Sequence, residues 1–337
     1  MCACSEKPRG SNPPGAGRVI GTGGPGPGSG SGGRLALARL QAAQAPLLWA
    51  AALSLALAGR EPFASWLYHF AWWPLLICLD GLLTLKGEPS LIWDRPREGL
   101  RLLGWSVTVW LVFEAFNLYL LNWRYADLEP RLTVRWCGYL LAFATVLPGI
   151  VLTARLLLAR GWWSGAKGSP RRLRAWQPLS LMLGAACVVL PLLSPTYAFP
   201  LLWLGFIFLL DPLVDLLTGD SLLGRWLAGE RREVYALLTA GLLLGFWWEF
   251  WNYPSLSRWI YTLPVLNFGK IFEMPVLGYL GFAPFALECA VMYSFLTALD
   301  RQVLDTPGRR TLAWMVQVLF WAVMFAAIDR VTVASFR

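Results

Sequence analysis

Long apolar stretches follow one another along nearly the whole chain, and each is bounded by charged residues, proline or glycine. The stretches are about 17 to 25 residues long, which as a helix is enough to cross the ~30 Å hydrocarbon core of a bilayer. The pattern predicts nine membrane-spanning helices. Their approximate ranges are 43–59, 65–84, 102–121, 136–158, 177–194, 199–217, 234–253, 274–297 and 311–329.

The composition favours lipid over water as the surroundings of this chain. Hydrophobic residues make up 57% of the 337 residues and charged residues only 15%. Soluble domains usually hold about 25% charged residues. The predicted fold class is therefore an all-α integral membrane protein.

The net charge of +9 comes from lysines and arginines that are divided among short loops between the spans. This distribution indicates membrane topology and gives no basic face for a nucleic acid. With a cytoplasmic N-terminus, the inside segments hold 20 of these residues and the outside segments 8, leaving out Arg155 within the fourth span. We therefore expect a multi-pass protein of the cell membrane with its N-terminus in the cytoplasm and its C-terminus outside.

Residues 1–42, which include "GTGGPGPGSGSGG", have the composition of a disordered cytoplasmic tail. Gly21, Gly23 and Gly26 have the GxGxxG spacing of a dinucleotide-binding turn. No predicted strand precedes them and Pro25 interrupts them, so we expect no nucleotide cofactor there.

A segment in the first half of the chain, "VFEAFNLYLLNWRY", resembles "GFWWEFWNYPSLSRWIY" in the second half. Each contains a glutamate followed three residues later by an asparagine, Glu114 with Asn117 and Glu249 with Asn252. Each ends in a Trp-x-Tyr motif, Trp123-x-Tyr125 or Trp259-x-Tyr261. These matches in the same order indicate an internal duplication.

The rest of the chain extends the repeat. Asp80 corresponds to Asp211, and both lie near the inner ends of their spans, where we expect them to cap or pair with the adjoining loops. The units are predicted at 43–160 and 175–300, and a further helix at 308–330 follows them. Four spans per unit is an even number, so the two copies run in the same direction and the architecture is 4 + 4 parallel spans plus one.

The repeated glutamates are the strongest candidates for chemistry. Glutamate and asparagine three residues apart share one helix face, and an ionisable group at hydrocarbon depth costs at least ~2.5 kcal/mol on insertion scales. In a structural interpretation, each acid bonds its own asparagine or an outer-loop arginine and locks two helices together. In a functional interpretation, burial makes each acid a proton donor or acceptor. In the span that holds Glu249, Gly241-x-x-x-Gly245 is typical of a close helix contact.

The second unit carries more acids than the first. Glu273 is expected at the outer mouth of the eighth span and Glu288 deeper within it, whereas the first unit has no acid at either place. On an ideal helix Glu288 lies ~22 Å beyond Glu273. Pro275 and Pro284 can shorten this distance, but Glu249 and Glu288 need not touch. The second unit is thus the predicted reactive half.

Several chemistries are excluded by the residues that the chain lacks. His69 is the single histidine, which excludes the histidine-rich di-iron enzymes of membranes, HExxH metalloproteases and b-type haem bundles. There is no Walker motif, and the cysteines have no metal or redox spacing. We therefore expect neither a metal nor another cofactor.

The second unit combines an acid near a span end, a Trp-x-aromatic loop, and a following span with Gly, Pro and a downstream Glu. The residues are Glu249, Trp259, Tyr261, Gly278, Pro284 and Glu288. This combination resembles the membrane domains of the non-flavin, bacterial and archaeal type of lycopene cyclase and the similar carotenoid hydratases. The family's Pro-x-Glu-Glu signature is not present, because Pro284-Phe-Ala-Leu-Glu288 spaces a single acid differently. Each unit also has four predicted spans, where three are expected for the family.

The resemblance implies an enzyme that protonates a double bond of an isoprenoid lipid, its partner in the membrane. Glu249 or Glu288 would be the acid, Glu273 an auxiliary carboxylate and Asn252 an orienting group. Trp251, Trp259 and Tyr261 would face the cation, and Glu114, Asn117, Trp123, Tyr125 and Tyr279 complete the candidate set.

A transporter or a lipid-binding scaffold is the competing interpretation, because parallel repeats with acids along a polar path fit it as well. A transporter should have a water-filled crevice that reaches the acids from alternate sides. An isoprenoid enzyme should have an apolar tunnel.

Overall fold

The computed structural model describes residues 32–171 and 173–337, and nine helical segments within them are long and apolar enough to cross a membrane. The first half contains α1 (Gly32–Leu57), α2 (Phe63–Leu85), α3 (Pro96–Leu120), β1 (Trp123–Ala126), α4 (Leu132–Phe143) and α5 (Val146–Ala159). The second half contains α6 (Trp176–Leu193), α7 (Pro195–Ala198), η1 (Phe199–Leu201), α8 (Leu202–Thr218), α9 (Leu222–Leu227), α10 (Arg232–Asn252), β2 (Arg258–Tyr261), β3 (Lys270–Ile271), β4 (Met274–Pro275), η2 (Val276–Gly278) and α11 (Tyr279–Gln302). The last helix is α12 (Pro307–Val331).

The first helix begins earlier than the sequence pattern predicts. α1 starts at Gly32, so residues 32–42 belong to this helix and not to the expected tail. Residues 32–42 are rich in Ala, Leu, Arg and Gln. These residues favour a helix even where a segment is too polar to be predicted as membrane-spanning. The remainder of the expected disordered tail, 1–31, lies outside the described residues.

The predicted fourth span consists of two helices, α4 and α5, with a break at Ala144 and Thr145. Pro148 contributes to the break, because it has no N–H to donate to the preceding turn. Ser106 of α3 satisfies the freed backbone: its hydroxyl donates to the Phe143 carbonyl at 2.6 Å and accepts the Leu147 N–H at 3.0 Å. Non-helical backbone at membrane depth is therefore satisfied by a buried side chain.

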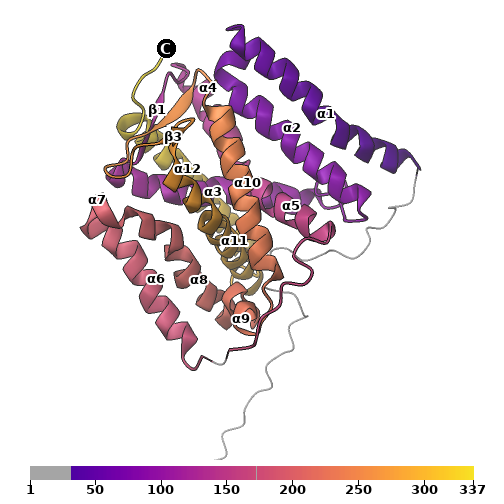
Figure 1. The fold of residues 1–337 in the computed structure, drawn as a ribbon, viewed down its shortest axis with the longest axis vertical. Helices are drawn as coiled ribbons and strands as arrows, with labels where there is room; N and C mark the ends of the chain where they lie inside the picture. The colour runs from indigo at the N-terminus through magenta and orange to yellow at the C-terminus, as the bar shows by residue number, and fades with distance from the viewer. Residues whose placement is uncertain (1–31, 172) are drawn as a thin grey trace, which may run out of the picture.

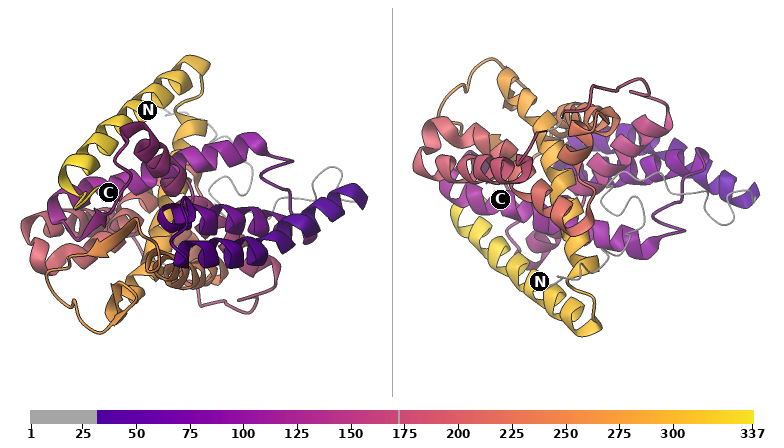
Figure 2. Two further views of the ribbon diagram at one scale, coloured as in Figure 1. Left: turned by 90° about the horizontal axis from the view of Figure 1, so that it is seen from above. Right: turned by 90° about the horizontal axis from the view of Figure 1, so that it is seen from below.

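The helices form two peripheral pairs around a central group. α1 packs on α2, α6 packs on α8, and α3, α5, α10 and α11 lie between the two pairs (Figure 1). α12 lies along α3 at the edge of the bundle, as the views from above and below show (Figure 2). β1, from the loop after α3, pairs with β2, from the loop after α10, so the two halves also meet through a short sheet.

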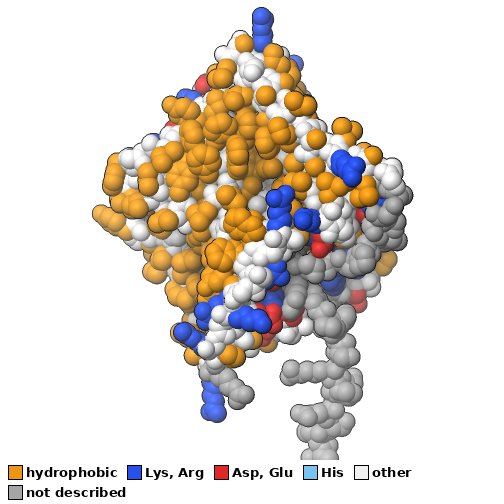
Figure 3. Space-filling view, turned by 45° about the vertical axis from the view of Figure 1, so that its right-hand side comes forward, with side chains coloured by type: hydrophobic (Ala, Val, Ile, Leu, Met, Phe, Trp, Pro, Cys, Tyr) orange, Lys and Arg blue, Asp and Glu red, His pale blue; other side chains and the backbone are white. Residues whose placement is uncertain are grey.

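The distribution of polar residues is that of a protein surrounded by lipid. A broad hydrophobic surface covers much of the face in Figure 3, and Lys and Arg gather mainly in the lower half of that view. Glu114, Asn117, Glu249, Asn252 and Glu288 are all buried. Because apolar side chains face outward and these polar side chains face inward, the structure is that of a multi-pass membrane protein.

Ion pairs join helix ends that a nine-pass path places on the same side. Arg101 at the start of α3 pairs with Asp300 near the end of α11 at 2.8 Å. Arg135 near the start of α4 pairs with Asp329 near the end of α12, also at 2.8 Å. Each pair therefore fixes one end of the bundle.

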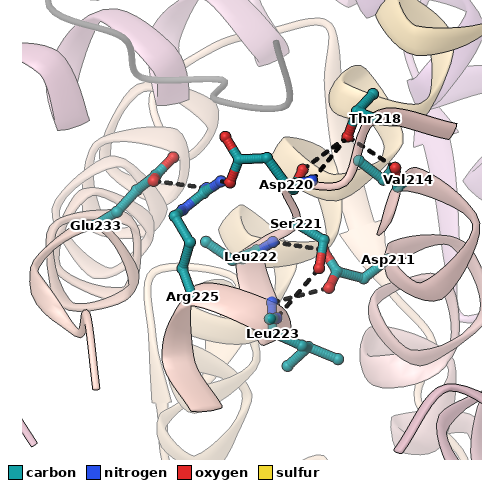
Figure 4. Close-up of polar contacts among 10 residues, drawn as sticks. Asp211, Val214, Thr218, Asp220, Ser221, Leu222, Leu223, Arg225 and Glu233 are labelled. Carbon is teal, nitrogen blue, oxygen red and sulfur yellow. Dashed lines mark hydrogen bonds and ion pairs between the residues drawn. The ribbon is translucent and has the colours of Figure 1, made fainter. Parts of the chain in front are cut away.

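At the end of the bundle opposite the sheet, Asp211 caps the loop that leads into α9. Its carboxylate accepts the N–H groups of Leu222 at 2.9 Å and Leu223 at 2.8 Å (Figure 4). In the first half, Asp80 accepts the N–H of Leu91 at 2.7 Å and the hydroxyl of Ser90 at 2.5 Å. The two aspartates therefore act as the loop caps that the sequence leads us to expect.

Two glycines bring α10 unusually close to α11. A Cβ on Gly241 would lie 2.2 Å from the Phe282 carbonyl oxygen, and one on Gly245 would lie 2.2 Å from the Phe282 ring. The Gly-x-x-x-Gly spacing therefore provides close packing, as predicted, and it holds the helix of Glu249 against α11.

Replacing Gly241 with alanine is expected to destabilise the protein by about 1–3 kcal/mol, because the new methyl group cannot fit without moving the backbone of α11. The measurement is the thermal unfolding temperature in detergent. Gly308→Ala is the matched control, since nothing lies within 4 Å of a Cβ at that helical position. Equal unfolding temperatures for the two variants would contradict the close contact.

Candidate functional site

The β1–β2 ribbon presents four aromatic side chains on one face. The strands are antiparallel, with Trp123 opposite Tyr261 and Tyr125 opposite Trp259. Alternate residues of a strand share a face, so both Trp-x-Tyr motifs point to the same side. One tryptophan and one tyrosine come from each half of the chain.

Each half uses its Trp-x-Tyr motif to hold its own glutamate. Glu114 Oε1 accepts the Tyr125 hydroxyl at 2.5 Å and the Trp123 indole N–H at 3.0 Å. In the second half, Glu249 Oε1 accepts the Tyr261 hydroxyl at 2.8 Å. The Trp259 indole N–H lies 3.1 Å from the Tyr261 hydroxyl oxygen and 3.4 Å from Glu249 Oε1. The other carboxyl oxygen, Oε2, of both acids is buried and has no hydrogen-bond partner within the described part of the chain.

The asparagines that follow the two glutamates hold the strands. Asn252 donates to the Trp259 carbonyl and accepts the Trp259 N–H, both at 2.9 Å. Asn117 makes the same pair of bonds with Trp123, at 2.9 Å and 3.2 Å. In the second half these bonds replace the expected bond between Glu249 and Asn252, because the amide matches a backbone N–H and C=O at the strand start.

Burial keeps the two tyrosines in the donor form. It raises the pKa of the Tyr125 and Tyr261 hydroxyls well above their usual value of 10, and the neighbouring glutamate raises each pKa further. Both residues lie in strands outside the spanning helices. Near neutral pH each hydroxyl is therefore protonated and donates a hydrogen bond to the glutamate.

A cavity of about 230 Å³ lies between the two halves. Its wall is mainly aromatic and comes from both halves. From the first half, the wall includes Trp66, Tyr68, His69, Trp110, Trp123, Tyr125, Tyr139 and Phe143. From the second half, it includes Phe199, Trp203, Trp248, Glu249, Trp259, Tyr261, Phe282 and Phe285.

The two glutamates differ in their relation to this cavity. Glu249 belongs to its wall, whereas Glu114 does not and lies behind the side chains of Trp123 and Tyr125. Both side chains are fully buried, and within the described residues neither forms an ion pair. Of the two glutamates, Glu249 is therefore the one that borders the cavity.

Asp329 of α12 organises the wall on the side of the first half. It receives the Arg135 guanidinium in two bonds of 2.8 Å, the Tyr139 hydroxyl at 2.8 Å and the Trp136 indole N–H at 3.0 Å. The segment after α12 then pairs with β1, since Tyr125 donates its N–H to Thr332 at 2.9 Å. The last helix thus supports two wall residues, Arg135 and Tyr139.

Besides Glu114, Asn117 and Asn252, four more predicted site residues lie outside the cavity wall. Glu288 is fully buried against α8, where its Oε1 accepts the Phe206 N–H at 2.7 Å. Glu273 lies half-buried between β3 and β4. Tyr279 donates its hydroxyl to the Ile271 carbonyl at 3.0 Å, and Trp251 packs its ring on Trp49 and Trp247.

The sequence pattern did not predict the wall residues of α2 and α4. As the single histidine, His69 indicates only that the chain lacks a histidine metal site. In the structure it lines the cavity, and its Nε2 lies 3.0 Å from the Gly138 carbonyl. The two strands were also missed, although a Trp-x-Tyr alternation is a strand signal. No local signal indicates that α2 and α4 reach the same cavity.

Comparison of the chain with protein-family models, with curated proteins and with solved structures finds no match in any of the three. Function must therefore be inferred from the site itself.

Replacing Tyr261 with phenylalanine is expected to cost about 1–3 kcal/mol of stability, because the buried Glu249 carboxyl loses its shorter hydrogen bond. Tyr125→Phe should cost at least as much, since its bond to Glu114 is shorter still. Unfolding temperatures in detergent measure both effects. Tyr197→Phe, at an exposed position, is the control, and an equal change there would count against the proposed bonds.

Proposed function

We propose that this protein is a membrane enzyme that acts on an isoprenoid lipid, with Glu249 as the acid that starts the reaction. One observation carries the proposal: a carboxyl group stands in the wall of an aromatic cavity, with one oxygen held by neutral donors and the other without a hydrogen-bond partner among the residues that the structure describes. This arrangement suits proton transfer to an apolar substrate.

The surroundings of Glu249 favour a carboxyl group that carries a proton. An ionised carboxylate without a cationic partner is costly to bury. The protonated form can deliver its proton from Oε2 to one carbon of a substrate double bond, which leaves a carbocation on the other carbon. After ring closure, the cyclic cation loses a proton to the carboxylate; after addition of one water molecule, the resulting oxonium ion loses a proton to the carboxylate and leaves an alcohol.

The aromatic wall suits such a cation. Ring faces attract positive charge, by about 2 kcal/mol or more where water is excluded. Trp110, Trp203, Trp248 and Phe285 belong to the wall together with the ribbon aromatics. They also keep out water that would quench the intermediate.

The size of the cavity fits the end of a prenyl chain. Its volume of about 230 Å³ exceeds that of engineered apolar cavities of ~150 Å³ that bind benzene. A whole carotenoid is much larger, so the remainder of such a molecule would lie outside the cavity.

The two units have separate roles in this proposal. They arose by duplication as 4 + 4 parallel spans, which is supported by the equivalent Glu, Asn, Trp and Tyr bonds and by the equivalent pairs α1–α2 and α6–α8. Glu114 is then a structural relative of the acid. The loop charges support a cell-membrane protein with a cytoplasmic N-terminus and an outer ribbon.

A transporter, the competing function, is less well supported. Glu288 has an unpaired Oε2 and would be the next acid along a path. Phe113, Phe206 and Phe285 pack ring against ring beside it, and Phe113 is fully buried. This packing favours a closed reaction chamber over a water-filled path.

The test places the protein in membranes with an acyclic carotenoid or a polyprenyl lipid and follows the lipids by chromatography and mass spectrometry. Glu249→Gln is expected to lower conversion by at least about 100-fold, because the amide has the same shape but no acidic proton. Glu114→Gln is the matched control and should stay close to the unchanged protein. If the folded, unchanged protein converts none of these lipids, the proposal is wrong.

A further inference from the structure

The cavity wall contains two arginines, and they differ in their partners. The guanidinium of Arg135 makes its two bonds of 2.8 Å to Asp329, and its Nη1 donates to the carbonyls of Glu129 and Pro130 at 2.7 Å and 2.9 Å. The Asp329 carboxylate therefore neutralises the charge of Arg135, and all three nitrogens of its guanidinium donate hydrogen bonds.

Arg258, at the start of β2, has no such compensation. Its Nη1 makes one long bond of 3.3 Å to the Tyr253 carbonyl, and its Nε is buried with no hydrogen-bond partner in residues 32–171 and 173–337. Among the described residues, no carboxylate lies within ion-pair distance of it. The side chain as a whole is half-buried, and an acceptor that reached the buried Nε would satisfy a donor that is otherwise left unpaired.

The acids of the wall do not offset this charge. Glu129 is engaged by Arg131, whose guanidinium donates at 2.7 Å and 3.2 Å and holds the pKa of Glu129 at about 2. Glu249 is held by neutral donors. The apolar cavity therefore has one uncompensated positive group beside it, on the residue that precedes Trp259 in the same strand.

From this arrangement we infer that the ligand is an amphiphile with a prenyl chain in the aromatic cavity and a phosphate or diphosphate head on Arg258. A guanidinium presents paired N–H donors that match the oxygens of phosphate, and the bonds are charge-assisted. The head would lie at the start of β2 while the chain passes the ring of Trp259 toward Glu249. The inference narrows the substrate and rests on the proposed function for the reaction, but its binding claim is measured separately.

The test measures binding to the full-length protein in neutral detergent through its tryptophan fluorescence, because tryptophans line the cavity. The probes are farnesyl phosphate, farnesol, inorganic phosphate and phosphatidylglycerol vesicles. Farnesyl phosphate is expected to bind at least about tenfold more tightly than farnesol, the equivalent of one charge-assisted hydrogen bond. Inorganic phosphate and the vesicles should compete poorly.

Arg258→Gln should bring the affinity for farnesyl phosphate down to that for farnesol and leave farnesol binding unchanged. Arg258→Lys, which keeps the charge but loses the paired donors, should fall between the two. Arg124→Gln is the matched control, because Arg124 lies on the neighbouring strand and outside this cavity wall. Each variant is compared at an unfolding temperature equal to that of the unchanged protein.

Equal affinity for farnesyl phosphate and farnesol, or an unchanged preference in Arg258→Gln, would overturn the inference. So would equal competition by phosphatidylglycerol, which would make Arg258 an anchor for bulk lipid. Conversion of neutral isoprenoids with none of this selectivity would leave the proposed function standing alone. Selective binding with no conversion of any lipid would instead contradict the proposed reaction and support the binding of an anionic prenyl lipid.

Discussion

The hydrogen bonds between the β1–β2 ribbon and the two buried glutamates hold this structure together. A carboxyl group at membrane depth needs partners inside the protein, and here each one receives a tyrosine hydroxyl and a tryptophan N–H from a strand beyond its helix. Because the two strands also pair with each other, the same contacts join the halves of the chain. Neutral donors hold the acids in place without a cation.

A tyrosine of the ribbon bonds each of the two glutamates, but the two glutamates have different surroundings. Glu114 and Glu249 have equivalent partners, yet only Glu249 belongs to the cavity wall. The difference comes from elements outside the ribbon: α2 and α4 build one wall, and Asp329 of α12 fixes Arg135 and Tyr139 within it. A symmetric framework thus carries one asymmetric site.

Buried side chains satisfy irregular backbone at three places in the described part of this protein. Ser106 bridges the freed carbonyl and N–H between α4 and α5, and Asp80 and Asp211 receive the N–H groups of their loops. Lipid offers no hydrogen bonds, so such side chains are required wherever a helix stops at membrane depth.

The sequence by itself determined what depends on local pattern. Apolar length predicted nine spanning segments, and the Glu-x-x-Asn and Trp-x-Tyr spacings identified the glutamates and the rings that contact them. The partners were decided only by the tertiary structure: the asparagines bond the strands, Glu288 faces α8, and His69 reaches the cavity from α2. The reason is that helical and strand periods fix which residues share a face, whereas the neighbour on that face depends on how distant segments pack.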